Sequence, residues 1–109
     1  MTIEQYELKL KDTLDINGVT ITDTFYGIRA SYRMDTWYIQ TKGIDGESAR
    51  IALFHKNMFT SKKSSGAVPD AHLQLRGSFT CEDLLNYILK HGRKFTSADP
   101  KVKHLRRAA

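Results

Sequence analysis

Four histidines are the side chains of this sequence best suited to acid–base chemistry or metal binding. They are His55, His72, His91 and His104. No two of them stand four residues apart on an expected helix, and no HExxH motif is present. Only His55 and His72 fall on expected strands, where they could converge, whereas His91 reads best as a cation at a helix C-terminus. The sequence therefore predicts no metal site and no cofactor.

A small metal-independent ribonuclease is one alternative function. Such an enzyme needs only a general base, a general acid and cations that hold the phosphate. These groups could be supplied from adjacent strands by His55, His72, Glu47, Arg50 and Lys56. These residues have no diagnostic spacing, so the ribonuclease is kept as an alternative. The absence of a glycine-rich phosphate loop and of a GxSxG motif argues against a nucleotide hydrolase.

The single cysteine, Cys81, excludes a disulfide within the chain and a cysteine-based zinc site. It lies on the apolar stripe of an expected helix, where we expect a buried and inert thiol. The first turn of a helix is also where a reactive thiolate would lie, which is the functional alternative.

Positive charge is concentrated at the end of the chain. The sequence has 17 Lys+Arg and 12 Asp+Glu, a formal net charge of +5, and residues 90–109 alone hold seven cations and one acid. Basic segments of this kind commonly follow the phosphate backbone of nucleic acid. The cations expected to contact phosphate belong to this segment and to a polar loop in the middle of the chain: Lys90, Arg93, Lys94, Lys101, Lys103, Arg106, Arg107, Lys62 and Lys63.

Arginines and aromatic residues alternate between residues 26 and 38. Arg29 and Arg33 could contact phosphates, and Tyr38 could stack on an unpaired base. Neighbouring residues of a strand face opposite sides, so Tyr38 is the better platform if Trp37 points into the core. The same residue types are also ordinary core and cross-strand pairs. Arg29, Arg33 and Tyr38 complete the predicted nucleic-acid site.

The two halves of the chain differ in charge. Residues 1–47 carry eight acids and five cations, whereas residues 48–79 carry five cations and one acid. If the fold separates these segments, one side of the protein faces anions.

Two hairpins are expected from alternating apolar residues. Residues 14–21 alternate about Asn17-Gly18, the preferred pair for a type I′ turn, which would set Ile16 opposite Val19. This register slightly favours a strand over residues 3–11, although a helix beginning with a Thr2–Gln5 capping box fits them as well.

The second hairpin is expected from residues 36–41 and 50–55, with a turn at Asp45-Gly46. A further strand is expected over residues 72–76. Both faces of the second hairpin contain apolar residues, so its inside and outside are not assigned.

Residues 81–91 predict an amphipathic helix, because their apolar side chains recur at helical spacing. Thr80 is the expected N-cap, with Asp83 as its capping-box partner, and Gly92 is the expected stop. The helix should pack on the sheet.

Together these patterns predict a single α+β domain over residues 1–92, with an antiparallel sheet of four to five strands, a flexible loop at about 60–70 and a basic tail over 93–109. The preferred function is non-enzymatic nucleic-acid binding. A protein-binding inhibitor or adaptor that engages an acidic partner is the first alternative. No apolar run is long enough to span a membrane and no signal peptide is recognisable, so the cytoplasm is the expected location.

Overall fold

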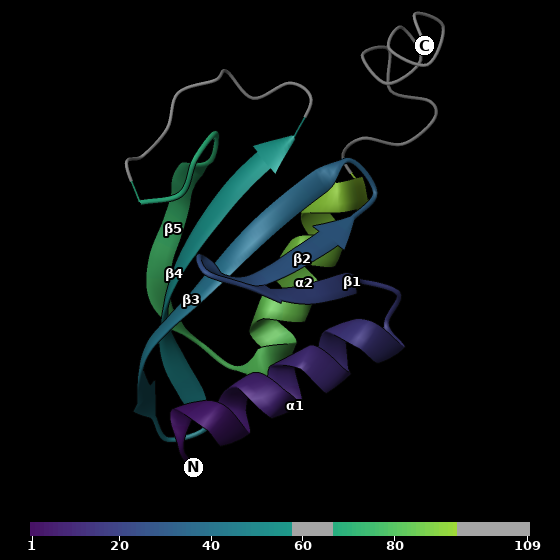
Figure 1. Cartoon of the computed structure of the whole chain (residues 1–109). Helices are drawn as coiled ribbons and strands as arrows, with labels where there is room; N and C mark the ends of the chain where they lie inside the picture. Colours follow the sequence, from purple (N-terminus) through teal and green to yellow (C-terminus); the bar gives the residue numbers. More distant parts are fainter. Residues whose placement is uncertain (58–66, 94–109) are drawn as a thin grey trace, which may run out of the picture.

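Five strands and two helices form the part of the chain that the computed structural model describes, residues 1–57 and 67–93. The strands make one antiparallel sheet in the order β1-β2-β3-β4-β5 (Figure 1). The predicted α+β class with an antiparallel sheet is thereby confirmed. The elements in chain order are α1 (Ile3–Ile16), β1 (Thr20–Thr24), β2 (Gly27–Tyr32), β3 (Asp35–Asp45), β4 (Ser48–Asn57), β5 (His72–Phe79) and α2 (Cys81–Arg93).

The N-terminal segment is a helix, so the strand favoured for residues 3–11 is wrong. The alternative is confirmed, because the Thr2 hydroxyl accepts from the backbone of Gln5 and the Gln5 side chain accepts from the backbone of Thr2. Tyr6, Leu10 and Leu14 are buried along one stripe of the helix. This helical stripe outweighed the alternation that suggested a strand.

The predicted hairpin at Asn17-Gly18 is also wrong, because these residues end α1. Gly18 has φ +83°, and the N–H groups of Gly18 and Val19 donate to the carbonyls of Asp15 and Leu14. This bonding pattern is a Schellman motif, in which a glycine in the left-handed region closes the helix. Val19 and Leu14 are both buried, which supplies the apolar contact typical of the motif. Ile16, expected opposite Val19, is instead 81% exposed.

The second predicted hairpin is confirmed as β3 and β4. Asp45 pairs with Ser48, so the chain reverses through Gly46 and Glu47. Gly46 has φ +63°, a conformation for which glycine is suited.

The last predicted strand and helix are confirmed as β5 and α2. The Thr80 hydroxyl accepts from the backbone of Asp83, and the Asp83 carboxylate accepts from the backbone of Thr80. The predicted stop at Gly92 is wrong, because α2 continues to Arg93. A Cβ on Gly92 would lie 2.6 Å from the ring of Tyr32, so glycine here allows α2 to approach β2.

Both helices cover one face of the sheet. Their apolar side chains and those of the inward strand positions form one core, in which Trp37 is fully buried. A smaller cluster on the other face contains Tyr38 and Phe54 with Val68 and Ala71, which follow the undescribed residues 58–66.

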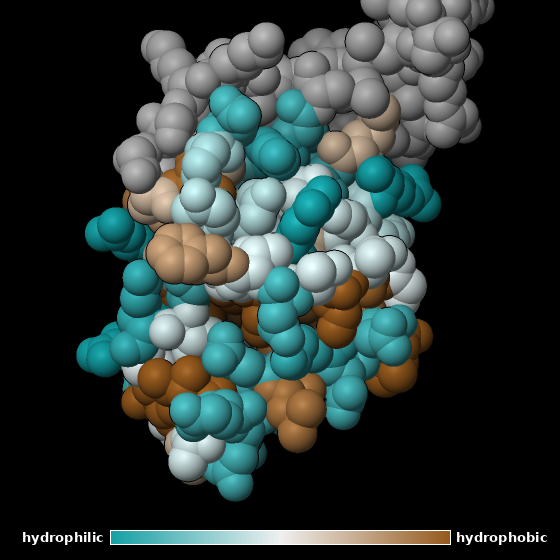
Figure 2. All heavy atoms as spheres, in the orientation of Figure 1, coloured by the Kyte–Doolittle hydropathy of each residue, from teal (hydrophilic) through white to brown (hydrophobic). Residues whose placement is uncertain are grey.

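Apolar side chains also remain at the surface over the lower part of the molecule, interrupted by hydrophilic ones (Figure 2). Leu8 and Ile16 of α1 are among those exposed. Within the described residues, neither helix is long and apolar enough to cross a membrane.

Candidate nucleic-acid interface and histidine cluster

The face of the sheet opposite the helices is assigned by strand pairing. Arg29 pairs with Tyr38 and Tyr38 with Phe54, so these side chains share a face. Trp37, the neighbour of Tyr38, lies in the core beneath the helices. The expectation that Trp37 and Tyr38 face opposite sides is therefore confirmed.

Five cations lie on this face, part of which is covered by Val68 and Ala71, and we name them the basic sheet face. Arg29, Lys56 and Arg76 are there by pairing with outward residues, and Arg50 pairs with Gly43 and lies across it. The register shift between Thr41 and Gly43 leaves Lys42 as an extra residue in β3. The Lys42 ammonium donates to the side chain of Gln40, which faces outward. The members are Arg29, Lys42, Arg50, Lys56 and Arg76.

No member of the basic sheet face forms an ion pair within the described residues. Among the described strand positions, pairing places one acid on this side, Asp45, at the turn into β4. The face therefore presents several uncompensated positive charges on a rigid sheet.

Aromatic rings adjoin the basic sheet face. Tyr38 is only 8% exposed, with the Lys56 ammonium 5.8 Å from its ring centroid and the Tyr26 ring edge-on at 6.4 Å. Tyr26 in turn contacts Phe25, which is 95% exposed in the turn between β1 and β2. The sequence analysis did not include Phe25 in the nucleic-acid site. Its exposure follows from its position in the turn between β1 and β2. Phe25 offers more open ring surface for stacking than Tyr38 does.

Three further predicted phosphate contacts lie around the C-terminal end of α2. Arg33 is exposed in the turn between β2 and β3, with its guanidinium 5.5 Å from the Tyr32 ring centroid. Lys90 and Arg93 are exposed in the last turns of α2. Gly92, which touches Tyr32, brings this end of the helix beside Arg33. The remaining predicted contacts lie outside the described residues: Lys62, Lys63, Lys94, Lys101, Lys103, Arg106 and Arg107.

On the helix side of the sheet, a buried carboxylate joins two of the histidines. Asp35 opens β3, and its side chain is completely buried. His55 Nε2 lies 2.6 Å from Asp35 Oδ1, and His91 Nδ1 lies 3.0 Å from Asp35 Oδ2. The amide of Asn57 donates to Oδ1 at 3.0 Å. We call Asp35, His55 and His91 the Asp35 cluster.

The Asp35 carboxylate is held in its ionised form. Burial opposes its ionisation, but hydrogen bonds from His55, Asn57 and His91 outweigh burial and lower the pKa of Asp35. His55 Nδ1 is buried without a hydrogen-bond partner among the described residues.

Trp37 and the neighbouring aromatic rings hold the cluster in place. The Trp37 ring lies 4.2 Å from the ring of His55 and 4.9 Å from that of His91, centroid to centroid. Tyr87 packs edge-on against Trp37 at 5.6 Å. The imidazoles are therefore fixed by packing as well as by hydrogen bonds.

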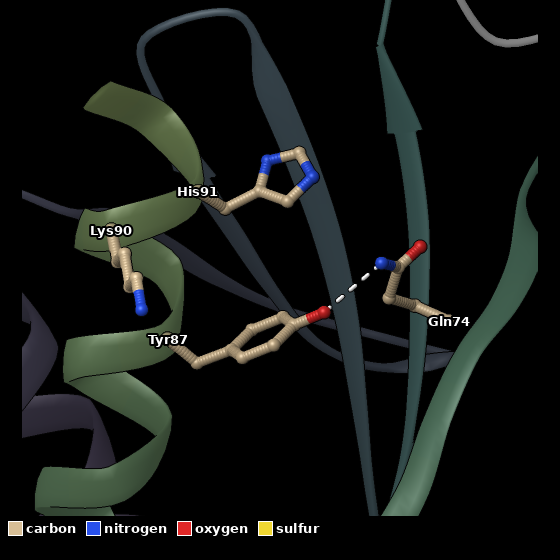
Figure 3. A pocket seen from close by; sticks show the side chains of 4 residues that line it. All are labelled: Gln74, Tyr87, Lys90 and His91. Carbon is tan, nitrogen blue, oxygen red and sulfur yellow. Dashed lines mark hydrogen bonds between the residues drawn. The ribbon is translucent and has the colours of Figure 1, made fainter. Parts of the chain in front are cut away.

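A pocket of about 220 Å³ lies beside the cluster and is lined by Gln74, Tyr87, Lys90 and His91 (Figure 3). The Gln74 amide donates to the Tyr87 hydroxyl at 3.0 Å, and its oxygen lies 2.7 Å from His72 Nε2. Gln74 is the extra residue where the β4–β5 register shifts, and such a bulge turns a side chain that regular pairing would direct elsewhere.

The structure brings together only two of the five residues considered for a ribonuclease, His55 and His72. The rings of His55 and His72 lie 5.2 Å apart, as their strand positions allowed. Arg50 and Lys56, however, belong to the opposite face of the sheet, and Glu47 lies in the turn between β3 and β4. Arg50 and Lys56 do not join the histidines because adjacent strand positions alternate in direction.

His91 was expected to act as a cation at the end of a helix. That expectation did not include its contact with Asp35. Its ring packs against Trp37 and its Nδ1 meets Asp35. The available signal was its spacing, because His91 continues the helical stripe of Leu84 and Ile88 toward the sheet.

Cys81 is buried in the core, as the inert interpretation expected. Burial raises the pKa of its thiol, which disfavours the reactive thiolate.

No known protein family, curated protein or solved structure matches this chain. Its function must therefore be argued from its own residues.

Proposed function

We propose that the protein binds single-stranded nucleic acid on the basic sheet face. The observation that carries this proposal is the placement of Arg29, Lys42, Arg50, Lys56 and Arg76 on one sheet face without carboxylate partners in the described residues. A row of fixed cations attracts the phosphate backbone and releases its counterions.

The separation of charge between the two sides supports this proposal. Four acids lie on α1, and the two cations of that helix are both paired, Lys9 with Glu82 and Lys11 with Asp23. The positive charge of α1 is thus compensated, whereas that of the basic sheet face is not. An approaching polyanion would be oriented toward the sheet.

The exposed ring of Phe25 favours single strands over duplexes. An aromatic side chain stacks on a base only when that base is not already stacked within a duplex. Phe25 contacts Tyr26, which contacts Tyr38 on the basic sheet face, so a stacked base would lie close to the phosphate-binding cations.

The cations predicted outside the described residues would extend this surface. Lys62 and Lys63 follow β4, which ends at Asn57, and the basic tail follows α2, which ends at Arg93. Asn57 and His91, near these two ends, both contact Asp35. The two basic segments therefore leave the domain from neighbouring points.

The test is fluorescence anisotropy of labelled single-stranded RNA and DNA with the full-length protein. Replacing Arg29, Arg50 and Arg76 by alanine should weaken binding at least tenfold and reduce its salt dependence, by roughly 0.7 in the log–log slope per lost phosphate contact. Phe25→Ala should weaken binding several-fold without changing that slope, because it removes stacking rather than charge.

The matched control replaces Lys9 and Lys11 by alanine on the helix side, and it should bind like the wild type. An equal loss in both sets of variants would contradict an oriented interface. No binding at low salt would refute the proposal and favour the protein-binding adaptor, while strands found cut on a gel afterwards would favour the ribonuclease.

A further inference from the structure

The Asp35 cluster has the composition of a transition-metal site. One oxygen of Asp35 and one ring nitrogen each of His55 and His91 lie within 4.8 Å of one another. Two imidazoles with one carboxylate form one of the donor sets that bind Zn²⁺ in proteins. We propose that this cluster binds one divalent transition-metal ion, Zn²⁺ above all.

Small side-chain movements would bring the donor atoms to coordination distance. Tetrahedral Zn²⁺ with bonds of about 2.0–2.1 Å separates neighbouring donors by roughly 3.3 Å. The nitrogens of His55 and His91 now lie 2.6 and 3.0 Å from the oxygens of Asp35. These two N···O separations must therefore grow by less than about 1 Å, and the widest separation among the three donors, at most 4.8 Å, must shrink by no more than about 1.5 Å.

The charge of the buried carboxylate provides the driving force. Within the described residues, Asp35 has no lysine or arginine partner, and its polar contacts are two imidazoles and one amide. A buried anion needs a compensating positive charge. A divalent cation held by the cluster would provide that charge.

The site is carried by rigid elements and can be reached from outside. Asp35, His55 and His91 belong to β3, β4 and α2, and the Trp37 ring packs against both imidazoles. His91 also lines the pocket of about 220 Å³ shown in Figure 3. Three protein ligands leave a fourth coordination position, as in catalytic zinc sites, and the pocket offers a route by which the ion and a water molecule enter.

The nitrogen donors decide which ions should bind. Imidazole favours Zn²⁺, Co²⁺, Ni²⁺ and Cu²⁺, whereas Mg²⁺ and Ca²⁺ prefer oxygen ligands. Protons compete with metal ions for imidazole nitrogens, so affinity for Zn²⁺ should fall as the pH is lowered.

The experiment titrates Zn²⁺ into full-length protein that has been stripped of metal with a chelator. Trp37 is the only tryptophan of the sequence and touches both imidazoles, so its fluorescence reports on the site directly. We expect one Zn²⁺ per chain, no response to Mg²⁺, and an affinity reduced at least tenfold in Asp35→Asn, His55→Gln and His91→Gln.

His104→Gln is the matched control, because it removes a histidine that is not one of the three proposed ligands and should leave binding unchanged. Circular dichroism checks that each variant is folded, and His91→Gln replaces the least buried member of the cluster. Binding that survives both His91→Gln and Asp35→Asn, or that is lost in His104→Gln, would overturn the proposal.

A second measurement needs no variant. Co²⁺ bound to the wild-type protein should give the intense visible absorption of four-coordinate Co²⁺, which Zn²⁺ should then displace. The weak spectrum of six-coordinate Co²⁺, or substoichiometric binding, would mean surface association only and would refute the site.

Discussion

At the scale of single residues, Asp35 is the most constrained polar group of the described structure. Its side chain is completely buried, and it accepts hydrogen bonds from two imidazoles and one amide. A carboxylate with this many donors is stabilised in its charged form despite burial. The same contacts would explain either a structural role in the metal-free protein or the metal site proposed above.

Replacing this carboxylate should destabilise the fold. We expect Asp35→Asn to lower the free energy of unfolding by about 3 kcal/mol near neutral pH, because the amide keeps only one acceptor oxygen and turns an NH2 donor toward an imidazole that the carboxylate accepted from. Urea denaturation with a chelator present measures this loss. Asp23→Asn, which breaks the partly exposed ion pair with Lys11, should change stability by less than about 1 kcal/mol.

The destabilisation by Asp35→Asn should also depend on pH. Because the pKa of Asp35 is lowered in the folded protein, its stabilising effect is complete above the unfolded carboxyl pKa of about 3.9. It is lost as the pH falls through the lower folded pKa. The gap between wild type and Asp35→Asn should therefore shrink in denaturation curves as the pH falls below about 4. A gap that widens in acid would contradict this assignment.

At the scale of elements, the Asn17-Gly18 pair decides how the first third of the chain folds. The same dipeptide can turn a hairpin or close a helix, since both need a residue in the left-handed region. Here the buried contact between Leu14 and Val19 accompanies helix closure. The helix end then directs β1 to the edge of the sheet.

Replacing Gly18 by alanine tests this helix end. A Cβ at Gly18 would meet no atom within 4 Å, so the effect arises from backbone strain at φ +83° alone. We expect Gly18→Ala to destabilise the protein by about 1 kcal/mol in thermal or urea unfolding. Asp12→Ala, at an exposed position of the same helix, should stay within about 0.5 kcal/mol of the wild type. Gly18→Ala with wild-type stability would refute the strain argument.

At the scale of the whole molecule, charge is arranged by side rather than by position in the chain. Arg29 and Lys42 come from the acidic first part of the sequence, yet they join Arg50, Lys56 and Arg76 on one face. The acids of α1 lie on the other side of the sheet. The net charge of +5 therefore understates how positive the basic sheet face is.

If the basic sheet face and the basic tail contact the same strand, their contributions should be separable by salt. Replacing Lys101, Lys103, Arg106 and Arg107 by glutamine in the full chain should lower affinity and reduce the salt slope in single-strand binding. Combined with the alanine variants of the sheet face, the slope reductions should add, because each removes different phosphate contacts. Tail variants that leave both affinity and slope unchanged would restrict binding to the sheet.

Local patterns in the sequence determined the elements with strong internal signals. The capped amphipathic helix α2, the hairpin of β3 and β4 and the strand β5 all follow from side-chain periodicity and turn residues within short windows. The burial of Cys81 followed from its place on the same helical stripe. Net charge and its uneven distribution were also fixed by the sequence.

Only the tertiary structure decided what depends on contacts between distant segments. Whether Asn17-Gly18 turned a strand or ended a helix depended on packing of the Leu14 stripe against the sheet. Strand register brought Arg29 beside Tyr38, and the approach of α2 to β3 brought His91 to Asp35, 56 residues away. Short-range patterns contain no information on such pairings, because a buried carboxylate chooses partners by proximity in space rather than by spacing in the chain.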